Sequence, residues 1–186
     1  KVNTYEHEHF QWIEKVTSYN SKRDDINQLV IGYFFINRLA QTTPYFASTL
    51  FHQFHPSNCS IFMEHIPGET LEKCIVENRI SFPELYSVWV QIAFILEYAQ
   101  DFCGFMHMDM YPWNIMIQRR EVSMVYTKHQ LKTSFSIHPV IIDYGNSHAS
   151  FDGHHFYNTS PFFANSMIDL VSLIITSLDL YLSKQT

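Results

Sequence analysis

The chain has 186 residues, of which 46% are hydrophobic and 16% are charged. This length and composition exclude a disordered chain and favour one globular domain, or most of one, with a core of ordinary size. The formal charge of −6 comes from acidic and basic residues mixed along the chain, which leaves no basic surface for nucleic acid. Nucleic acid is therefore not an expected partner.

The cysteines and the apolar segments bear on the cellular compartment. Cys59, Cys74 and Cys103 are widely spaced and form no Cys-x-x-Cys pair, and no signal peptide is expected ahead of them. Reduced thiols in an intracellular protein, in the cytoplasm of a cell or host, fit this pattern best. The longest apolar runs, residues 29–36 and 170–182, are short or interrupted by polar side chains, so no membrane contact is expected.

Apolar periodicity predicts two helices in the first part of the chain. The first covers residues 4–18, with Thr4 as its N-cap. The second, mostly buried, covers residues 26–39 and ends before Pro44. The side chains expected on the apolar face of the first helix are Tyr5, His9, Trp12, Ile13 and Val16.

Strand and turn patterns follow. Residues 49–55 and 59–64 are apolar runs joined by a Pro-Ser-Asn turn, which predicts an antiparallel hairpin. A short helix is expected over residues 69–76. Ser81 and Glu84 form a capping box that opens a longer apolar helix to about residue 102.

The last third of the chain alternates apolar and polar segments. Residues 115–117 and 140–142 are expected to be short strands, joined by a hairpin or long loop over residues 118–139. Residues 146–165 are expected to be irregular. A final amphipathic helix is predicted over residues 166–183.

Two acidic motifs lie where apolar segments meet turns. The first is His107-Met108-Asp109 with Asn114 five places after the aspartate, and the second is Asp143-Tyr144-Gly145. Because these motifs flank a local hairpin, Asp109, Asn114 and Asp143 should share one cleft. One carboxylate beside a hydroxyl, with a carboxylate and an amide oxygen for Mg²⁺, is how a phosphoryl-transfer site is built.

The order of these elements and motifs resembles the protein-kinase family, from the end of its third strand into the large lobe, over roughly residues 24–183. In motif form the chain most resembles divergent kinases of large DNA viruses and, more distantly, haspin-type kinases. The resemblance implies an α+β, protein-kinase-like fold. Residues 1–66 would form an incomplete small lobe with the hinge, and residues 67–186 a mostly helical large lobe.

The resemblance also implies roles for the motif residues. Asp109 would be the catalytic aspartate, and Asn114 and Asp143 would hold Mg²⁺. Asp169 would brace the backbone of the catalytic loop by accepting hydrogen bonds from its buried amides. The motif residues His107 and Gly145 would have supporting structural roles.

The ATP site implied by the resemblance lies near residue 64. Met63 would be the gatekeeper, Glu64 and Ile66 would offer backbone groups to the adenine, and Glu69 would reach the ribose. For the lysine that anchors the phosphates, Lys1 is preferred, because Lys15 falls within the first predicted helix and is expected to point to solvent. Gln28 occupies the place of its acidic partner, and the substitutes considered are Glu6, Glu8 and Glu14.

Departures from the family pattern limit what can be inferred. Met108 and Tyr111 stand where protein kinases usually have Arg and Lys, which leaves the class of substrate open. The five glycines are too scattered to form a glycine-rich phosphate loop, and the chain begins at Lys1, so an N-terminal truncation is expected.

The leading functional prediction is a parent protein that transfers the γ-phosphoryl group of Mg-ATP to Ser or Thr hydroxyls of a protein substrate. One alternative is a small-molecule kinase of the aminoglycoside or choline kinase type. Another is a pseudokinase that binds partners without catalysis. The sequence leaves the oligomeric state open.

Overall fold

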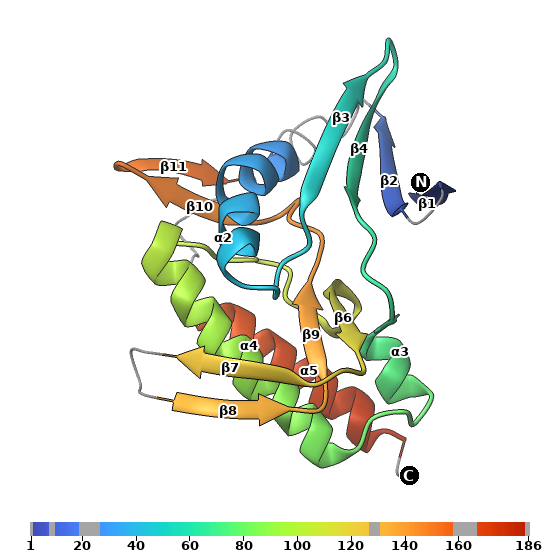
Figure 1. The fold of residues 1–186 in the computed structure, drawn as a ribbon, viewed down its shortest axis with the longest axis vertical. Helices are drawn as coiled ribbons and strands as arrows, with labels where there is room; N and C mark the ends of the chain where they lie inside the picture. The colour runs from blue at the N-terminus through green and yellow to red at the C-terminus, as the bar shows by residue number, and fades with distance from the viewer. Residues whose placement is uncertain (1, 8–9, 19–26, 127–130, 158–166, 185–186) are drawn as a thin grey trace.

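The computed structural model has a mixed α/β fold (Figure 1). A four-stranded sheet and a helix lie at one end of the molecule, three further helices lie at the other, and a small three-stranded sheet lies between them. The described residues are 2–7, 10–18, 27–126, 131–157 and 167–184.

The N-terminal sheet has the order β1-β2-β4-β3, with every neighbouring pair antiparallel. The β3–β4 pair confirms the predicted hairpin, and its turn is closed by a 2.8 Å hydrogen bond from His55 N to Asn58 O. The strands are β1 (Val2–His7), β2 (Phe10–Ser18), β3 (Thr49–Phe54) and β4 (Asn58–Glu64).

The predicted helix over residues 4–18 is wrong, because β1 and β2 form a hairpin there. Tyr5 lies opposite Trp12 in this hairpin, and their rings stack with centroids 5.9 Å apart. Asn3 donates a 3.0 Å hydrogen bond from Nδ2 to Oε2 of Glu14, its cross-strand partner. Aromatic and polar cross-strand pairs of this kind stabilise a sheet and outweigh an apparent helical spacing.

The predicted buried helix is present over residues 27–42. It contains a π-helical segment, η2 (Ile31–Ile36), followed by α2 (Asn37–Thr42). A Cβ atom on Gly32 would lie 2.2 Å from Thr49 Oγ1, so the close approach of β3 to this helix requires glycine.

The capped helix begins as predicted. The Ser81 side chain accepts from Glu84 N, and the Glu84 side chain accepts from Ser81 N, which completes the capping box of α4 (Phe82–Cys103). The segment expected to be a short helix divides into β5 (Glu69–Thr70) and α3 (Leu71–Val76).

The predicted strands near the two acidic motifs pair directly with each other. They are β6 (Ile115–Gln118), which follows the short helix η3 (Pro112–Asn114), and β9 (His138–Ile141). The segment between them forms the hairpin β7 (Val122–Tyr126) and β8 (Leu131–Phe135).

The stretch expected to be irregular contains a further hairpin, so that expectation is wrong for its first part. The hairpin consists of β10 (His148–Phe151) and β11 (His154–Tyr157), while residues 158–166 lie outside the described residues. The final predicted helix is present as α5 (Ile168–Leu182).

The core lies mainly where α4 packs against the helix over residues 27–42, against α5 and against the strand pair β6–β9. Trp89 Nε1 donates a 2.9 Å hydrogen bond to Ser177 Oγ, which joins α4 to α5 inside the core. The three cysteines are buried free thiols. None of the helices in the described part of the chain combines the length and the hydrophobicity that a membrane span requires.

His138 makes the stability of this core sensitive to pH. Its ring is fully buried, lies edge-on to Tyr45 with centroids 4.7 Å apart, and has Arg120 close to Nδ1. Burial, together with the charge of Arg120, lowers the pKa of His138 to about 4. Below the ordinary pKa of 6.5 the unfolded chain therefore binds a proton that the folded chain does not.

We predict that the free energy of unfolding falls as the pH drops from 6.5 to about 4, and that His138→Gln reduces this fall by at most about 3 kcal/mol. Urea unfolding curves measured across this pH range test the prediction. His7→Gln, at an exposed position in β1, controls for the loss of one histidine. An equal pH dependence in wild type and His138→Gln would contradict the assignment.

Candidate active site

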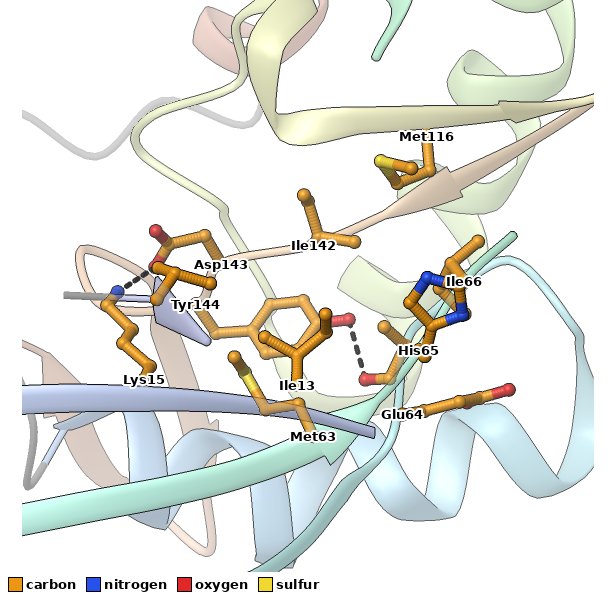
Figure 2. Close-up of a pocket in the computed structure, with 12 residues that line it drawn as sticks. Ile13, Lys15, Met63, Glu64, His65, Ile66, Met116, Ile142, Asp143 and Tyr144 are labelled. Carbon is orange, nitrogen blue, oxygen red and sulfur yellow. Dashed lines mark hydrogen bonds and ion pairs between the residues drawn. The ribbon is translucent and has the colours of Figure 1, made fainter. Parts of the chain in front are cut away.

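A cavity of about 250 Å³ lies between the N-terminal sheet and the β6–β9 pair (Figure 2). Lys15 and Asp143 point toward each other at one end, and the segment Glu64–Ile66 lies at the other. The apolar side chains that line the cavity come from both sides of it: Val2, Ile13, Ala47, Met63, Ile66, Met116 and Ile142.

Lys15 lies on β2, with Nζ 2.8 Å from Asp143 Oδ1 and 3.0 Å from Gln28 Oε1. The expectation that Lys15 points to solvent is wrong, because β2 is a strand and turns both Ile13 and Lys15 toward the cavity. Lys1, the lysine preferred from the sequence, lies outside the described residues. The sequence signal for Lys15 is its period-two spacing from Ile13.

Asp143 keeps a negative charge in this environment. Its partial burial by itself raises the pKa of the carboxyl group, but the charge and hydrogen bond of Lys15, helped by Gly145 N–H, outweigh that effect. The pKa of Asp143 therefore lies below its ordinary value. The carboxylate is ionised at neutral pH and available to a cation.

Gln28 connects the ion pair to the middle of the cavity. Its Oε1 accepts from Lys15, and its Nε2 lies 3.1 Å from Met63 Sδ. Gln28 thus occupies the position at Lys15 that was expected for an acidic partner. Glu14, one of the acids considered instead, accepts hydrogen bonds from Asn3 and Tyr5 of β1.

Asp109 and Asn114 are held together within the first motif. Asn114 Nδ2 donates to the backbone oxygen of Asp109 at 2.8 Å and to its carboxylate Oδ2 at 3.0 Å. The backbone oxygen of Asn114 accepts from Ile142 N at 3.0 Å, which links this motif to the residue before Asp143. Because Nδ2 is committed to Asp109, the amide oxygen is the group of Asn114 left for a cation.

Asp169, buried at the start of α5, accepts hydrogen bonds from two backbone amides of the first motif. The distances are 2.6 Å from His107 N and 2.8 Å from Met108 N. Burial raises the pKa of Asp169, while the charge of His107 and these two donors oppose the rise. Met108 has a φ of +64°, an unusual value that such contacts hold in place.

His107 links the two motifs from inside the core. Its ring is fully buried, and Nε2 donates a 2.9 Å hydrogen bond to the backbone oxygen of Ile142. A carbonyl can only accept, so this contact fixes the hydrogen on Nε2. Nδ1 is buried and has no hydrogen-bond partner among the described residues.

Two residues that were assigned no role from the sequence hold the segment around Asp143. Tyr144 is buried, and its hydroxyl lies 2.9 Å from Ala47 O and 2.8 Å from Ile141 O. Asn27 donates from Nδ2 to Gly145 O at 3.2 Å and to Ser147 O at 2.7 Å. A polar residue within a strongly apolar helix is the signal that could have identified Asn27.

The residues assigned to an adenine and ribose divide into two groups. Met63, Glu64 and Ile66 line the cavity. Glu69 is not among the lining residues, and its carboxylate pairs with Lys73 at 2.8 Å and with Arg79 at 2.5 Å. Among the described residues, no group of three or more His, Cys, Asp or Glu side chains is placed to hold a metal ion.

Relatives of this chain are known in viruses. Uncharacterized protein 179R of Invertebrate iridescent virus 6 is 33% identical over 153 residues, which cover 68% of this chain and 12% of that protein. Uncharacterized protein 035R of Invertebrate iridescent virus 3 is 29% identical over 134 residues, 64% of this chain and 12% of that protein.

A third relative has a functional name. Probable kinase 098L of Invertebrate iridescent virus 3 is 30% identical over 134 residues, which cover 69% of this chain and 25% of that protein. The chain thus spans between an eighth and a quarter of the length of these relatives. No family model matches the chain.

Removing the lysine should change the titration of its partner. We predict that Lys15→Met raises the pKa of Asp143, because the charge that favours the ionised carboxylate is gone while its partial burial remains. Carboxyl-carbon NMR of the two proteins across acidic pH measures the shift. Lys73→Met, which removes a surface partner of Glu69, should leave the titration of Asp143 unchanged.

Replacing the buried acid of α5 should weaken the whole fold. We predict that Asp169→Ala lowers the free energy of unfolding by about 3 kcal/mol, because the amides of His107 and Met108 lose their acceptor in the core. Asp179→Asn, at an exposed position of the same helix, should change it by less than about 0.5 kcal/mol. Chemical denaturation of both variants tests this, and equal losses would refute it.

Proposed function

We propose that this chain is part of a protein-kinase-like domain whose parent protein transfers the γ-phosphoryl group of ATP to Ser or Thr hydroxyls of a protein. The observation that carries the proposal is the Lys15–Asp143 ion pair at the end of an apolar cavity. A backbone hydrogen bond from Ile142 N to Asn114 O links the residue before Asp143 to the Asp109–Asn114 pair. The name of the viral relative, probable kinase, supports the same reaction class.

In this proposal Asp109 orients the substrate hydroxyl and accepts its proton. The hydrogen bond from Asn114 Nδ2 fixes the direction of the carboxylate, so that Oδ1 is the oxygen turned to the hydroxyl. Asp169 holds the backbone that carries Asp109 through its contacts with the two preceding amides. Catalysis then depends on positioning and on charge, as in other phosphoryl transfers.

The residues present fit a magnesium ion. Asp143 supplies an ionised carboxylate and Asn114 an amide oxygen, both of the hard oxygen type that Mg²⁺ prefers. A bound ion would neutralise charge on the phosphate oxygens. Lys15 lies beside Asp143, and its ammonium group would bind phosphate oxygens directly.

The nucleotide would enter the cavity with its base between apolar walls. Ile13 and Met116 come from opposite sides of the cavity, and Met63 and Ile66 continue the apolar lining toward the segment that joins the two halves. Backbone groups of Glu64 and Ile66 would bond the base. This arrangement follows the general form of ligand sites, in which apolar walls carry a few polar groups that fix orientation.

The proposal includes a division of the chain. Residues 1–66 would belong to a small lobe and residues 67–186 to a large lobe, with the cavity between them. The parent would be a larger protein, because the chain matches only a part of each viral relative.

One observation favours a small-molecule hydroxyl as the second candidate substrate. Tyr111 and Trp113 stack near Asp109 with centroids 4.6 Å apart, and Trp113 is 43% exposed. A flat aromatic surface there suits a compact ligand, and Tyr111 supplies no cation to the phosphoryl group. Phosphate transfer to a peptide library and to a panel of hydroxylated metabolites, measured side by side, separates the two substrates.

The central test removes the proposed acid groups one at a time. We predict that Asp109→Asn and Asp143→Asn each reduce phosphoryl transfer by at least about a hundredfold, whereas Asp179→Asn leaves it unchanged. Transfer of labelled phosphate from ATP by the parent protein is the measurement. Activity like that of the wild type in either site variant would sink the proposal.

A further inference from the structure

We propose that Asn27 is a positioning residue that holds the loop after Asp143 so that the Asp143 carboxylate is aimed at the metal. The inference rests on the proposed function and deepens it. In this inference Asn27, an uncharged residue of the N-terminal helix, controls the affinity of the site for magnesium.

The contacts of Asn27 are specific to this loop. Both hydrogen bonds leave the same atom, Nδ2, and reach Gly145 O at 3.2 Å and Ser147 O at 2.7 Å. An amide nitrogen has two hydrogens, so these bonds use its full donor capacity. Asn27 is only 6% exposed, so water cannot readily replace it as the donor to these carbonyls.

The loop needs such support because of its backbone. Asp143 has a φ of +61°, in the left-handed region that residues other than glycine rarely adopt. A conformation of this kind persists only where the surroundings fix it. Asn27 fixes the chain two and four residues after Asp143, while the Tyr144 hydroxyl fixes it one residue after.

The neighbouring residue of the helix holds the other half of the ion pair. Gln28 accepts a hydrogen bond from Lys15, and Asn27 binds the loop that carries Asp143. Two consecutive side chains therefore set the geometry of both partners at once. A small rotation of the helix would move Lys15 and the Asp143 loop together.

The effect of Asn27 extends to the first motif. Ser147, whose backbone oxygen accepts from Asn27, donates from its hydroxyl to His107 O at 3.3 Å. The next residue, His148, exchanges two backbone hydrogen bonds with Met106, at 2.7 and 2.9 Å. The loop held by Asn27 is thus bonded directly to the segment that leads to Asp109.

Asn37 provides a matched control on the same helix. It also uses its side chain for two backbone contacts, donating to Thr49 O at 2.8 Å and accepting from Thr49 N at 2.9 Å. These bonds join the helix to β3 and touch neither motif. If Asn27 merely satisfies polar groups in the core, Asn27→Ala and Asn37→Ala should behave alike.

The experiment compares Asn27→Ala, Asn27→Leu and Asn37→Ala in the 186-residue chain. Asn27→Leu keeps the approximate size of the side chain, adds no charge and removes both donors, and it replaces Asn27→Ala should the latter fail to fold. ATP binding is followed by the shift in melting temperature, first in EDTA and then along a Mg²⁺ titration. Hydrogen exchange of residues 143–148 is measured without nucleotide.

We expect both Asn27 variants to raise the Mg²⁺ concentration at half-saturation by about tenfold or more, with ATP affinity in EDTA changed by less than about twofold. Exchange across residues 143–148 should be faster than in the wild type. Asn37→Ala should lower the melting temperature and leave the magnesium titration and this exchange unchanged.

Two outcomes would overturn the inference: a magnesium titration of the Asn27 variants equal to that of the wild type, or an equal change in Asn37→Ala. A wild-type chain that binds no ATP would instead count against the proposed function. In that case hydrogen exchange still decides the role of Asn27. Equal exchange of residues 143–148 in the wild type and the Asn27 variants would reject it.

Discussion

The ion pair between Lys15 and Asp143 joins two parts of the molecule that are far apart in sequence. Lys15 belongs to the N-terminal sheet, whereas Asp143 follows the strand pair that packs on α4, and only 2.8 Å separates Nζ from Oδ1. Both side chains are partly exposed, so the pair contributes little to stability on its own. Its importance is geometric, because the cavity lies between the elements that it joins, and its polar end is defined by these two charges.

The conformation of the first motif depends on polar groups that are hydrogen-bonded within the core. Asp169 takes the amides of His107 and Met108, and His107 in turn donates from its ring to Ile142 O. Each contact satisfies a polar group that would be costly to leave unpaired in the core. Together they stabilise the positive φ of Met108 and fix the direction of the backbone at the next residue, Asp109.

Sequence patterns predicted the elements whose signals are local. The capping box at Ser81 fixed the start of α4, and the Pro-Ser-Asn turn fixed the β3–β4 hairpin. They failed over residues 4–18, where apolar spacing resembled a helix although the register pairs Tyr5 with Trp12. Cross-strand pairing is a long-range property, invisible to a periodicity count, and the error concealed Lys15. The partners of Asn27 lie 118 and 120 residues away, which no local pattern could reveal.

Lys15 bonds one neutral side chain, Gln28, and one acidic side chain, Asp143. An acidic side chain at the position of Gln28 would form a second ion pair with Lys15, whereas the neutral amide oxygen of Gln28 only accepts a hydrogen bond from it. Asp143 is therefore the one carboxylate that the described structure bonds to Lys15. Under the proposed function, a divalent cation would bind Asp143 and the phosphates would bind Lys15. Each side chain would then bond to its ligand in place of the other side chain of the ion pair. Metal and nucleotide binding would then be coupled through this single contact, and the helix that carries Asn27 and Gln28 would set how readily the contact opens.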